Sequence, residues 1–440
     1  MSGLNPTIAA LSTPPGEGAI ALIRMSGPDT SSVLEGIFRS SRPPAPRQAT
    51  LGRIVNREGA TIDQVVVTTY PGPASYTGED VAEIGCHGGI LNAARVLQTV
   101  LSAGAAGAGP GEFTQRAFLN GKLDLTQAEA VMDLIRAQTP RAAAAAAEQL
   151  EGRIGAATNQ IRDAIVEITA HVEAFIDFPE EGIDPDTGEL LLTKLDEART
   201  QITDLLATAD EGRVLREGVR LAICGRPNAG KSSLLNRLLG FERAIVSPTA
   251  GTTRDTIEES ISLRGIPFRV VDTAGLRDTD DSVEREGVDR ARRAIDRADL
   301  VVRVVDGASG EGVSDPPATE EEFVVLNKSD VGSDHGDTGG HRISCVTGAG
   351  VDDLVDQLVA RVAPTHESGS LAAINARHQA CLTLAADSLA AAAEALRTGT
   401  EPEFISLDLH AALDAVGNVV GRVDSEDILG KIFSSFCIGK

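Results

Sequence analysis

The chain has 440 residues, which is too long for one compact core and predicts two to four domains. Its formal net charge of −24 argues against non-specific binding to nucleic acid or anionic lipid, although a local basic groove on an acidic body stays compatible with it. Aromatic residues make up 3% of the chain and Trp is absent, which argues against an extensive platform for stacking bases. The acidity indicates either a salt-adapted organism or a margin of solubility.

Cysteine usage and hydropathy bear on the compartment. The five cysteines are scattered without a C-x-x-C pair, which predicts free thiols in a reducing compartment. No apolar run reaches the roughly 20 residues of a membrane-spanning helix, and residues 1–10 lack the basic start and the cleavage site of a signal peptide. We therefore expect a soluble, cytoplasmic protein without a membrane partner.

Residues 1–120 predict a β-rich α+β domain, because residues 18–24 and 64–70 are strand-like runs bounded by Gly and Pro.

Residues 121–217 predict the first part of a helical domain rich in Ala, Glu, Gln and Leu. Apolar residues recur there with the alternating four- and three-residue spacing of an amphipathic helix and form a seam along one face. Residues 178–185 are expected to interrupt the helices as an acidic loop. The seam consists of Ile161, Ile165, Ile168, Val172 and Phe175.

Residues 218–363 predict an α/β domain. The apolar runs 270–272, 300–305 and 323–326 are typical of strands that are buried on both faces, as in a parallel sheet. Residues 364–440 begin with a linker and continue as a second Ala/Leu-rich helical segment. We therefore expect a multidomain protein in which the α/β domain is inserted into a discontinuous helical domain.

The strongest motif is at residues 225–232 (GRPNAGKS), which fit the P-loop pattern G-x-x-x-x-G-K-[ST] between a strand-like and a helix-like run. Its glycines let backbone N–H groups turn toward the β-phosphate of a nucleotide, at a helix N-terminus that favours anions. Lys231 is expected to contact the β- and γ-phosphates, and the Ser232 hydroxyl to bind Mg²⁺. A chance glycine-rich turn is the alternative, but further motifs follow in order.

Those motifs identify the nucleotide as GTP and predict a Ras-like P-loop GTPase domain. Thr253 is the expected switch threonine of the Mg²⁺ shell, Asp272 is expected to hold the metal through water, and the Gly275 N–H to sense the γ-phosphate. Asp330, within residues 327–330 (NKSD), can accept hydrogen bonds from guanine N1 and N2, which adenine cannot donate. The predicted GTP-binding residues are Asn228, Ala229, Gly230, Lys231, Ser232, Ser233, Ser247, Pro248, Thr249, Ala250, Gly251, Thr252, Thr253, Asp272, Thr273, Ala274, Gly275, Asn327, Lys328 and Asp330.

One position departs from Ras-like GTPases. Leu276 stands where those proteins carry the glutamine that positions the attacking water, and an apolar side chain cannot orient water. Another group must do so, and an ion or a partner must neutralise the charge of the transition state. The acidic candidates downstream, unless they form a solvated switch helix, are Asp278, Asp280, Asp281, Glu284 and Glu286.

Motifs along the whole chain resemble the MnmE (TrmE) family of tRNA-modification GTPases. They are residues 13–18 (TPPGEG), 76–80 (YTGED), 85–89 (GCHGG), 110–125 (PGEFTQRAFLNGKLDL) and 433–440 (FSSFCIGK). The resemblance implies a GTP-hydrolysing enzyme that works with an FAD-dependent MnmG (GidA) partner as a heterotetramer, with FAD only on the partner. It would add a carboxymethylaminomethyl or aminomethyl group to C5 of wobble uridine 34 in tRNA, using 5-formyl- or methylene-tetrahydrofolate as the one-carbon source.

The resemblance also implies a potassium-dependent catalytic cycle. Hydrolysis is activated when the two GTPase domains of a homodimer meet, and a potassium ion beside the β- and γ-phosphates offsets the developing charge. Glu284 matches the glutamate that orients the attacking water through a bridging water. The implied Mg²⁺ ligands are Ser232 and Thr253, and the implied K⁺ ligands are Asn228, Ser247, Thr249 and Thr252, where Ser247 replaces a familiar Thr.

In the N-terminal domain, which is the expected homodimer contact, the resemblance implies a folate site. Its residues would be Arg24, Glu83, Lys122 and Lys440, whose charges suit an anionic glutamyl tail and a pterin. From the residues alone, Arg24 would be a surface charge at a strand end. The resemblance favours the folate role instead.

Two cysteines invite a chemical interpretation. Cys437 is either a residue of the one-carbon chemistry or a buried small hydrophobe. Cys86 and His87 could form a metal pair, but two ligands without others do not make a site. We therefore expect His87 to pack in a glycine-rich turn.

Two other functions are alternatives. A ribosome-assembly GTPase of the Era or Der type shares the GTPase motifs, but adds a KH-type domain with a G-x-x-G loop and a basic surface. A purely regulatory switch would hydrolyse GTP slowly and would bind no folate. The sequences that flank the GTPase domain favour the tRNA-modification family over both.

Overall fold

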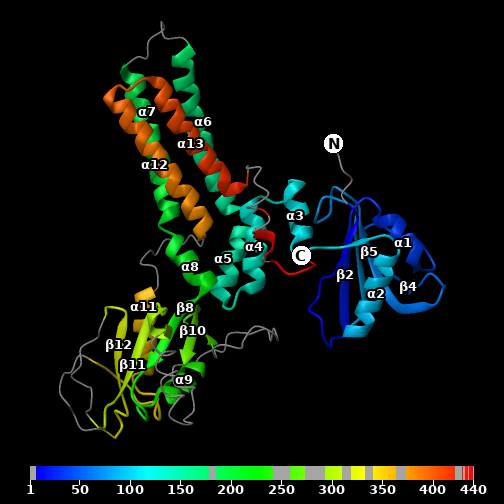
Figure 1. The fold of residues 1–440 in the computed structure, drawn as a ribbon, viewed down its shortest axis with the longest axis horizontal. Coiled ribbons are helices and arrows are strands. Elements are labelled where there is room, and N and C mark those ends of the chain that lie inside the picture. Colours follow the sequence, from blue (N-terminus) through cyan, green and yellow to red (C-terminus); the bar gives the residue numbers. More distant parts are fainter. Residues whose placement is uncertain are drawn as a thin grey trace. The chain divides into compact units, whose positions relative to one another are not determined.

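The structure, a computed structural model, describes residues 6–177, 185–240, 258–272, 293–309, 319–331, 340–362, 373–421, 429, 432–434 and 436–439. The chain divides into two compact units (Figure 1). The first unit comprises Met1–Met132 and Gly417–Lys440, and the second comprises Asp133–Val416. The expected domain boundaries at residues 120, 217 and 363 stay predictions.

The first unit is built on a seven-stranded sheet with the order β3-β4-β5-β6-β2-β1-β7. Its strands pair antiparallel, except that β1 and β7 run parallel. The elements are β1 (Ile8–Leu11), β2 (Ile20–Ser26), α1 (Thr30–Ile37), β3 (Phe38–Arg39), β4 (Thr50–Val55), β5 (Thr61–Tyr70), β6 (Val81–His87), α2 (Ile90–Ser102), β7 (Ala106–Gly107) and α3 (Glu112–Leu119). Helix α4 (Leu125–Arg136) begins in this unit.

The alternation of side chains along the strands explains why one face of this sheet carries helices. Val65 and Val67 of β5 are buried, whereas Val66 between them is 42% exposed. The buried set packs with apolar residues of α1 and α2 into one core. On the opposite face Ile20, Leu51 and Val66 stay exposed, with Leu51 directly opposite Val66. The sheet therefore has an apolar stripe that no described residue covers.

The end of the chain belongs to the first unit. Phe433 and Phe436 pack against Ala128 and Met132 of α4, and the two phenyl rings lie 5.4 Å apart. The Gly111 N–H donates to the Cys437 carbonyl (3.3 Å). The tail therefore lies beside the start of α3.

The second unit contains a bundle of long helices and an α/β part. Figure 1 shows α6, α7, α12 and α13 side by side. The seam predicted on α6 is confirmed, since its four aliphatic residues are buried and Phe175 is half-buried. The helices of the bundle and its base are α5 (Pro140–Leu150), α6 (Arg153–Asp177), α7 (Pro185–Leu206), α8 (Ala209–Glu217), α12 (Ala376–Thr398) and α13 (Pro402–Val420).

The α/β part lies in sequence between α8 and α12, and it has a six-stranded sheet with the order β13-β12-β11-β8-β10-β9. All neighbouring strands are parallel except β9, which runs antiparallel to β10. Its elements are β8 (Val219–Cys224), α9 (Lys231–Leu239), β9 (Glu258–Leu263), β10 (Ile266–Asp272), β11 (Leu300–Asp306), β12 (Glu322–Asn327), β13 (His341–Arg342) and α11 (Val351–Val362). The expected fold class, with a P-loop α/β domain inserted into a discontinuous helical domain, is confirmed.

The structure also bears on the cysteines and on membrane-spanning helices. All five cysteines are free, and only Cys437 is exposed. Within the described ranges, none of the helices has both the length and the apolar character that crossing a bilayer requires.

Candidate functional site

The P-loop connects β8 to α9 in a conformation that requires glycine at both ends. Gly225 has φ +141°, and a Cβ there would lie 2.2 Å from the Val304 carbonyl oxygen. Gly230 has φ +104°, and its Cβ would lie 2.0 Å from Asn327 Nδ2. Because any side chain would clash at these positions, the loop keeps its backbone close to the neighbouring strands.

The groups expected to hold phosphate lie at the N-terminus of α9. Gly230 is the N-cap and offers no side chain, so the first N–H groups of the helix are directed outward, as anion-binding helices require. Lys231 Nζ donates to the Arg226 carbonyl (2.9 Å). Ser232 and Ser233 follow on the exposed side of the first turn. The charged and hydroxyl donors predicted for phosphate and Mg²⁺ are therefore together and accessible.

The motif expected to recognise guanine is joined to this loop by one buried side chain. Asn327, at the end of β12, is 3% exposed and donates through Nδ2 to the Ala229 carbonyl (2.9 Å). Its Oδ1 accepts from the Cys345 N–H (3.1 Å). Asp330 lies three residues further on and is exposed, as a residue that binds a base must be.

Lys328 is fixed beside the same edge of the sheet. Its φ is +67°, and its Nζ lies 2.5 Å from Asp306 Oδ2 at the end of β11. The hydrogen bond from Lys328 is the main reason why the pKa of the Asp306 carboxyl is lowered, although partial burial opposes it. The end of β11 and the start of the guanine motif are thus joined by an ion pair.

Several predicted residues lie outside the described residues: Ser247, Pro248, Thr249, Ala250, Gly251, Thr252, Thr253, Thr273, Ala274, Gly275, Glu284 and Lys440. Asp272 is described by its backbone, which ends β10 opposite Ile223 of β8. This register places Asp272 at the carboxyl edge of the sheet, one residue pair before the P-loop begins. Its predicted metal role is compatible with that position.

Two of the predicted folate residues form an ion pair in the first unit. Arg24 and Glu83 are opposite each other on β2 and β6, and Arg24 donates through Nε (3.0 Å) and Nη2 (2.8 Å) to Glu83 Oε1. Their side chains are only 15% and 23% exposed. The Arg24 guanidinium also lies over the rings of Tyr76 (5.3 Å) and Phe113 (5.9 Å). Arg24 is therefore not a simple surface charge.

Tyr70 lies near this ion pair, and Lys122 lies beside the 76–78 loop. Burial raises the pKa of the Tyr70 hydroxyl, and the neighbouring Glu83 carboxylate raises it further. Lys122 is exposed, and its side chain passes within 3.4 Å of the position that a Cβ on Gly78 would take. The 76–78 loop thus contacts both Arg24, through Tyr76, and Lys122.

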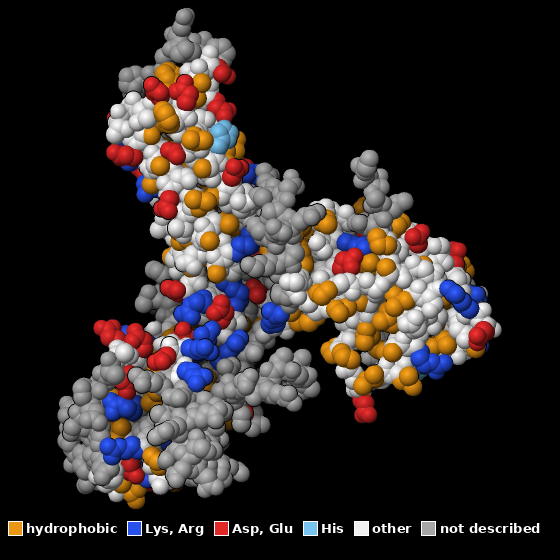
Figure 2. Space-filling view, viewed as in Figure 1, with side chains coloured by type: hydrophobic (Ala, Val, Ile, Leu, Met, Phe, Trp, Pro, Cys, Tyr) orange, Lys and Arg blue, Asp and Glu red, His pale blue; other side chains and the backbone are white. Residues whose placement is uncertain are grey.

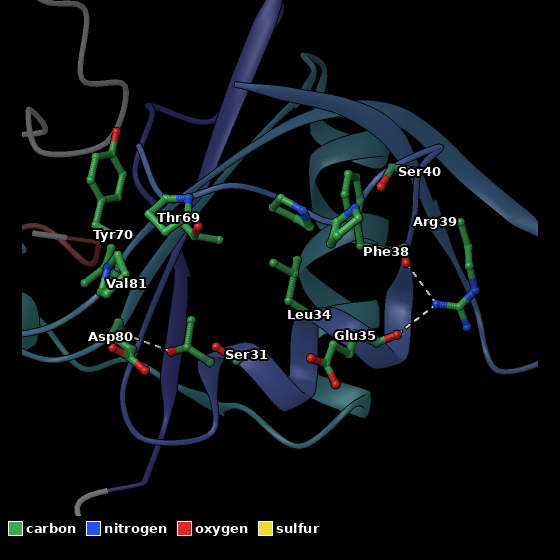
Figure 3. A pocket seen from close by; sticks show the side chains of 15 residues that line it. Ser31, Leu34, Glu35, Phe38, Arg39, Ser40, Thr69, Tyr70, Asp80 and Val81 are labelled. Carbon is green, nitrogen blue, oxygen red and sulfur yellow. Dashed lines mark hydrogen bonds between the residues drawn. The ribbon is translucent and has the colours of Figure 1, made fainter. Parts of the chain in front are cut away.

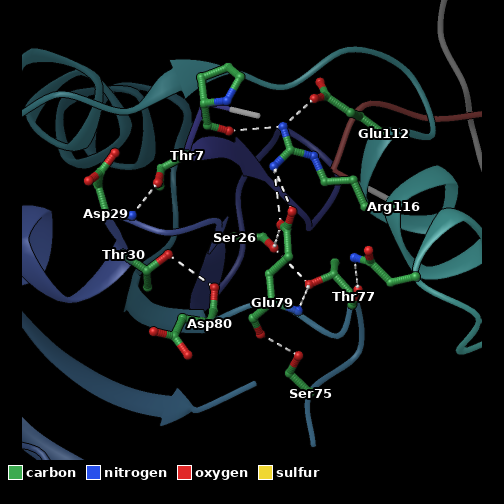
Figure 4. A network of polar contacts seen from close by, with 12 residues as sticks. Thr7, Ser26, Asp29, Thr30, Ser75, Thr77, Glu79, Asp80, Glu112 and Arg116 are labelled. Atoms are coloured by element: carbon green, nitrogen blue, oxygen red, sulfur yellow. Dashed lines mark hydrogen bonds and ion pairs between the residues drawn. The ribbon is translucent and has the colours of Figure 1, made fainter. Parts of the chain in front are cut away.

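A buried network holds that loop in place (Figure 4), and sequence reasoning did not single it out. The Arg116 side chain is 5% exposed and forms ion pairs with Glu79 (3.1 Å) and Glu112 (2.7 Å). Ser26 Oγ contacts both Glu79 Oε2 and Thr77 Oγ1 at 2.7 Å. The sequence offered a signal for most of this network, because Thr77 and Glu79 belong to the YTGED motif and Glu112 and Arg116 to the PGEFTQRAF motif.

Two sequence interpretations are corrected. Cys437 is exposed, so it is not a buried small hydrophobe. The His87 side chain is 69% exposed and its Nδ1 lies 2.7 Å from Asp63 Oδ1, so it does not pack in the glycine-rich turn. A glycine-rich turn offers no apolar neighbours to bury an imidazole, whereas the Asp63 carboxylate gives it a hydrogen-bond partner. The described residues contain no group of three or more His, Cys, Asp or Glu that could hold a metal.

The first unit also has a cavity of about 590 Å³ between α1, the 40–46 segment and the end of β5 (Figure 3). Glu35, Phe38, Tyr70 and Asp80 are among its lining residues. Arg39 at its rim donates to the carbonyl oxygens of Glu35 and Phe38. Of the predicted folate residues that the structure describes, Arg24, Glu83 and Lys122, none lines this cavity.

Comparisons with known proteins agree over the whole chain. Residues 7–122 match the family described as "GTP-binding protein TrmE N-terminus", and residues 125–437 match the "MnmE helical domain". The chain is 50% identical to the tRNA modification GTPase MnmE of Akkermansia muciniphila, with 99% of each chain covered. It is 44% identical to that of Roseiflexus sp., with 99% of each covered. It is 43% identical to that of Aquifex aeolicus, covering 98% of this chain and 99% of that one.

Among solved structures, the G domain of the T. maritima FeoB iron transporter is 21% identical to this chain. The match covers 32% of this chain and 97% of the other, with a TM-score of 0.24.

Proposed function

The chain belongs to the MnmE family of tRNA modification GTPases and is a GTP hydrolase; from this premise we propose that it uses GTP hydrolysis to drive a modification of tRNA. The observation that carries the proposal is the presence, in one chain, of a P-loop joined to the guanine motif through Asn327 and of the shielded Arg24–Glu83 ion pair in the first unit. Ribosome assembly and pure regulation are set aside, because neither accounts for the matched N-terminal region.

In the proposed cycle, the P-loop and the first turn of α9 bind the β- and γ-phosphates. Lys231 would exchange the Arg226 carbonyl for phosphate oxygen, and Ser232 and Thr253 would hold Mg²⁺. The magnesium ion supplies positive charge that offsets the charge developing on the phosphates. Asp330 selects guanine, and Asn327 keeps its loop aligned with the P-loop.

We propose that potassium replaces an arginine finger when two GTPase domains meet. Asn228 supports this proposal, because it is exposed at φ +63° on the outer side of the P-loop, where its amide oxygen could reach an ion beside the phosphates. Ser247, Thr249 and Thr252 would complete the ligand set. Glu284 would orient water in place of the glutamine that Leu276 replaces.

We propose that the modification takes place in the first unit, with 5-formyl- or methylene-tetrahydrofolate bound by Arg24, Glu83, Lys122 and Lys440. Arg24 and Glu83 are held together and partly shielded from water, which suits polar recognition of a pterin or of a glutamyl tail. Cys437 is exposed beside α3 and could take part in the one-carbon chemistry. An FAD-dependent MnmG-type partner would supply the redox step at C5 of wobble uridine 34.

The apolar stripe of the N-terminal sheet supports a homodimer. Ile20 is 71% exposed and Leu51 is 60% exposed. Contiguous apolar surface on a sheet face is typical of a protein interface. Figure 2 shows hydrophobic side chains gathered on the visible face of the first unit.

The first test measures GTP turnover. GTP turnover is measured in KCl and in NaCl at equal ionic strength, for the wild type, Glu284→Ala and the neighbouring control Glu286→Ala. We expect potassium to stimulate the wild type and the control, and Glu284→Ala to bind GTP without that stimulation. Equal rates in both salts would contradict the potassium site, and a fully active Glu284→Ala would remove Glu284 from the mechanism.

The tRNA role is tested separately. The protein is incubated with its partner, tRNA, methylene-tetrahydrofolate, GTP and an amine source, and the nucleosides are analysed by mass spectrometry. We expect a new mass on wobble uridine that Lys231→Ala abolishes. Unmodified tRNA from a preparation that hydrolyses GTP normally would contradict the proposal.

A further inference from the structure

Positive charge gathers on part of the visible face of the second unit, although the chain as a whole is acidic. Figure 2 shows Lys and Arg side chains clustered in the second unit, over the region of α5, α8, β8 and β10 in Figure 1. The chain as a whole carries 40 basic against 64 acidic residues, so such a cluster is not expected from composition. The cluster is a local exception to the negative charge of the chain, which as a whole repels anions.

Two arginines belong to neighbouring strands of this region. Arg220 of β8 and Arg269 of β10 are directly opposite each other in the parallel register, so both side chains are on the same face of neighbouring strands. Arg220 is exposed and Arg269 is partly exposed. Like charges at opposed positions on a sheet repel each other. Within the described part of the chain, neither side chain forms an ion pair that would relieve this repulsion.

The nearby carboxylates are already engaged. Asp299 accepts from the Arg220 backbone N–H (2.8 Å) and from Arg213 of α8 (3.4 Å). Glu211 forms an ion pair with Arg141 of α5 (2.6 Å). These contacts fix the backbone of the junction between α8 and β8 without neutralising the guanidinium groups of Arg220 and Arg269. The surface is therefore prepared for an anion from outside.

The geometry suits phosphate groups. Neighbouring strands are about 5 Å apart, so the backbones of Arg220 and Arg269 are close enough for their guanidinium groups to bind one phosphate or two successive ones. Ser260 of β9 is directly opposite Arg269 and adds a hydroxyl to the same row. Arg213, whose side chain is 46% exposed, extends the positive surface toward α8. Arginines and hydroxyls are the groups that typically contact nucleic-acid backbones.

The row is distant from the nucleotide. Arg220 is the second residue of β8 and Arg269 is the middle residue of β10, whereas the P-loop begins after the last residue of β8. Cys224 lies four positions after Arg220 along the strand, which corresponds to about 13 Å. A phosphate group bound on this row would therefore not occupy the GTP site.

We propose that Arg213, Arg220 and Arg269, with Ser260, form a docking surface for the phosphate backbone of RNA. This proposal rests on the proposed function, which makes tRNA the substrate, and it assigns part of the tRNA contact to the junction of the helical and α/β parts of the second unit. Contacts to the backbone position an RNA without reading its sequence. The surface would hold any tRNA with similar strength, and other elements would select the substrate.

The test measures tRNA binding by fluorescence anisotropy with the full chain, over a series of NaCl concentrations. We expect Arg220→Gln with Arg269→Gln to weaken binding roughly 10- to 100-fold and to reduce the slope of log affinity against log salt by about 2. The matched control is Arg199→Gln with Arg397→Gln, which removes the same charge from α7 and α12, where both arginines pair with Asp196. It should change affinity less than about threefold.

The outcomes separate this surface from the proposed function. Wild-type protein that binds tRNA with the same affinity and salt slope as the Arg220/Arg269 double variant would overturn the surface alone. Wild-type protein that binds no tRNA, with or without its FAD-dependent partner, would overturn both. Loss of partner binding with tRNA binding intact would overturn the RNA assignment in favour of a protein contact.

Folding is controlled by a second variant. Arg220→Lys with Arg269→Lys keeps both charges and should keep most of the affinity, while GTP turnover and the thermal midpoint should be unchanged in all variants. A lysine pair as weak as the glutamine pair, with folding and turnover intact, would contradict a contact based on phosphate charge.

Discussion

Asn327 and Ala229 join the two halves of the nucleotide site: the Asn327 side chain donates to the Ala229 carbonyl across 2.9 Å, although the two residues are 98 positions apart. The same amide accepts from the Cys345 N–H. One buried side chain therefore determines where the P-loop lies relative to the guanine motif.

We expect Asn327→Ala to weaken GTP binding by one to two orders of magnitude. The change leaves the buried Ala229 carbonyl and Cys345 N–H without a partner, and each such loss typically costs about 1–3 kcal/mol. Affinity is measured by titration with a fluorescent GTP analogue. The control is Ser329→Ala, which keeps the backbone hydrogen bond from Ser329 to Ile343 and should bind nearly normally. An Asn327→Ala protein with wild-type affinity would show that the link is dispensable.

Arg24→Gln and Glu83→Gln are each expected to weaken binding of 5-formyl-tetrahydrofolate roughly tenfold or more, because charge-assisted hydrogen bonds at a shielded site are stronger than neutral ones. Binding is measured by calorimetry. If the pair acts as a unit, the double variant should lose less than the sum of the two single effects. Arg95→Gln, an exposed arginine on α2, is the control and should bind normally. Unchanged binding in both single variants would exclude this pair from a folate site.

Asp63 predicts a pH dependence of stability. Burial raises the pKa of its carboxyl, but hydrogen bonds from Asn92 and His87 outweigh burial and lower the pKa below its ordinary value. A carboxyl with a lowered folded-state pKa stabilises the fold above its unfolded-state pKa of about 3.9, and this contribution is lost as pH falls through the folded-state pKa.

We therefore expect Asp63→Asn to lower the thermal midpoint at pH 7, and the difference from the wild type to shrink below about pH 4. Glu35→Gln, at an exposed position on α1, should show little difference at any pH. A difference that stays constant down to low pH would show that the Asp63 charge does not contribute.

Local motifs could be recognised from the sequence because they encode backbone conformation. Gly225 and Gly230 take positive φ values that other residues rarely adopt, so a short sequence motif is enough to identify the P-loop. The seam of α6 could be predicted for a similar reason, since the spacing of its apolar residues follows the turn of the helix. The family and the order of strand and helix followed from such local patterns.

The sequence by itself thus determined the fold class, the family and the GTP motifs, whereas the tertiary structure decided which distant residues meet. The pairing of β8 with β10 places Arg220 opposite Arg269, and the C-terminal tail places the Cys437 carbonyl against Gly111. Arg116 is a buried partner of Glu79 because α3 packs beside the 75–80 loop. Strand register and helix packing depend on the whole core, because a shift of one residue moves every side chain to the other face.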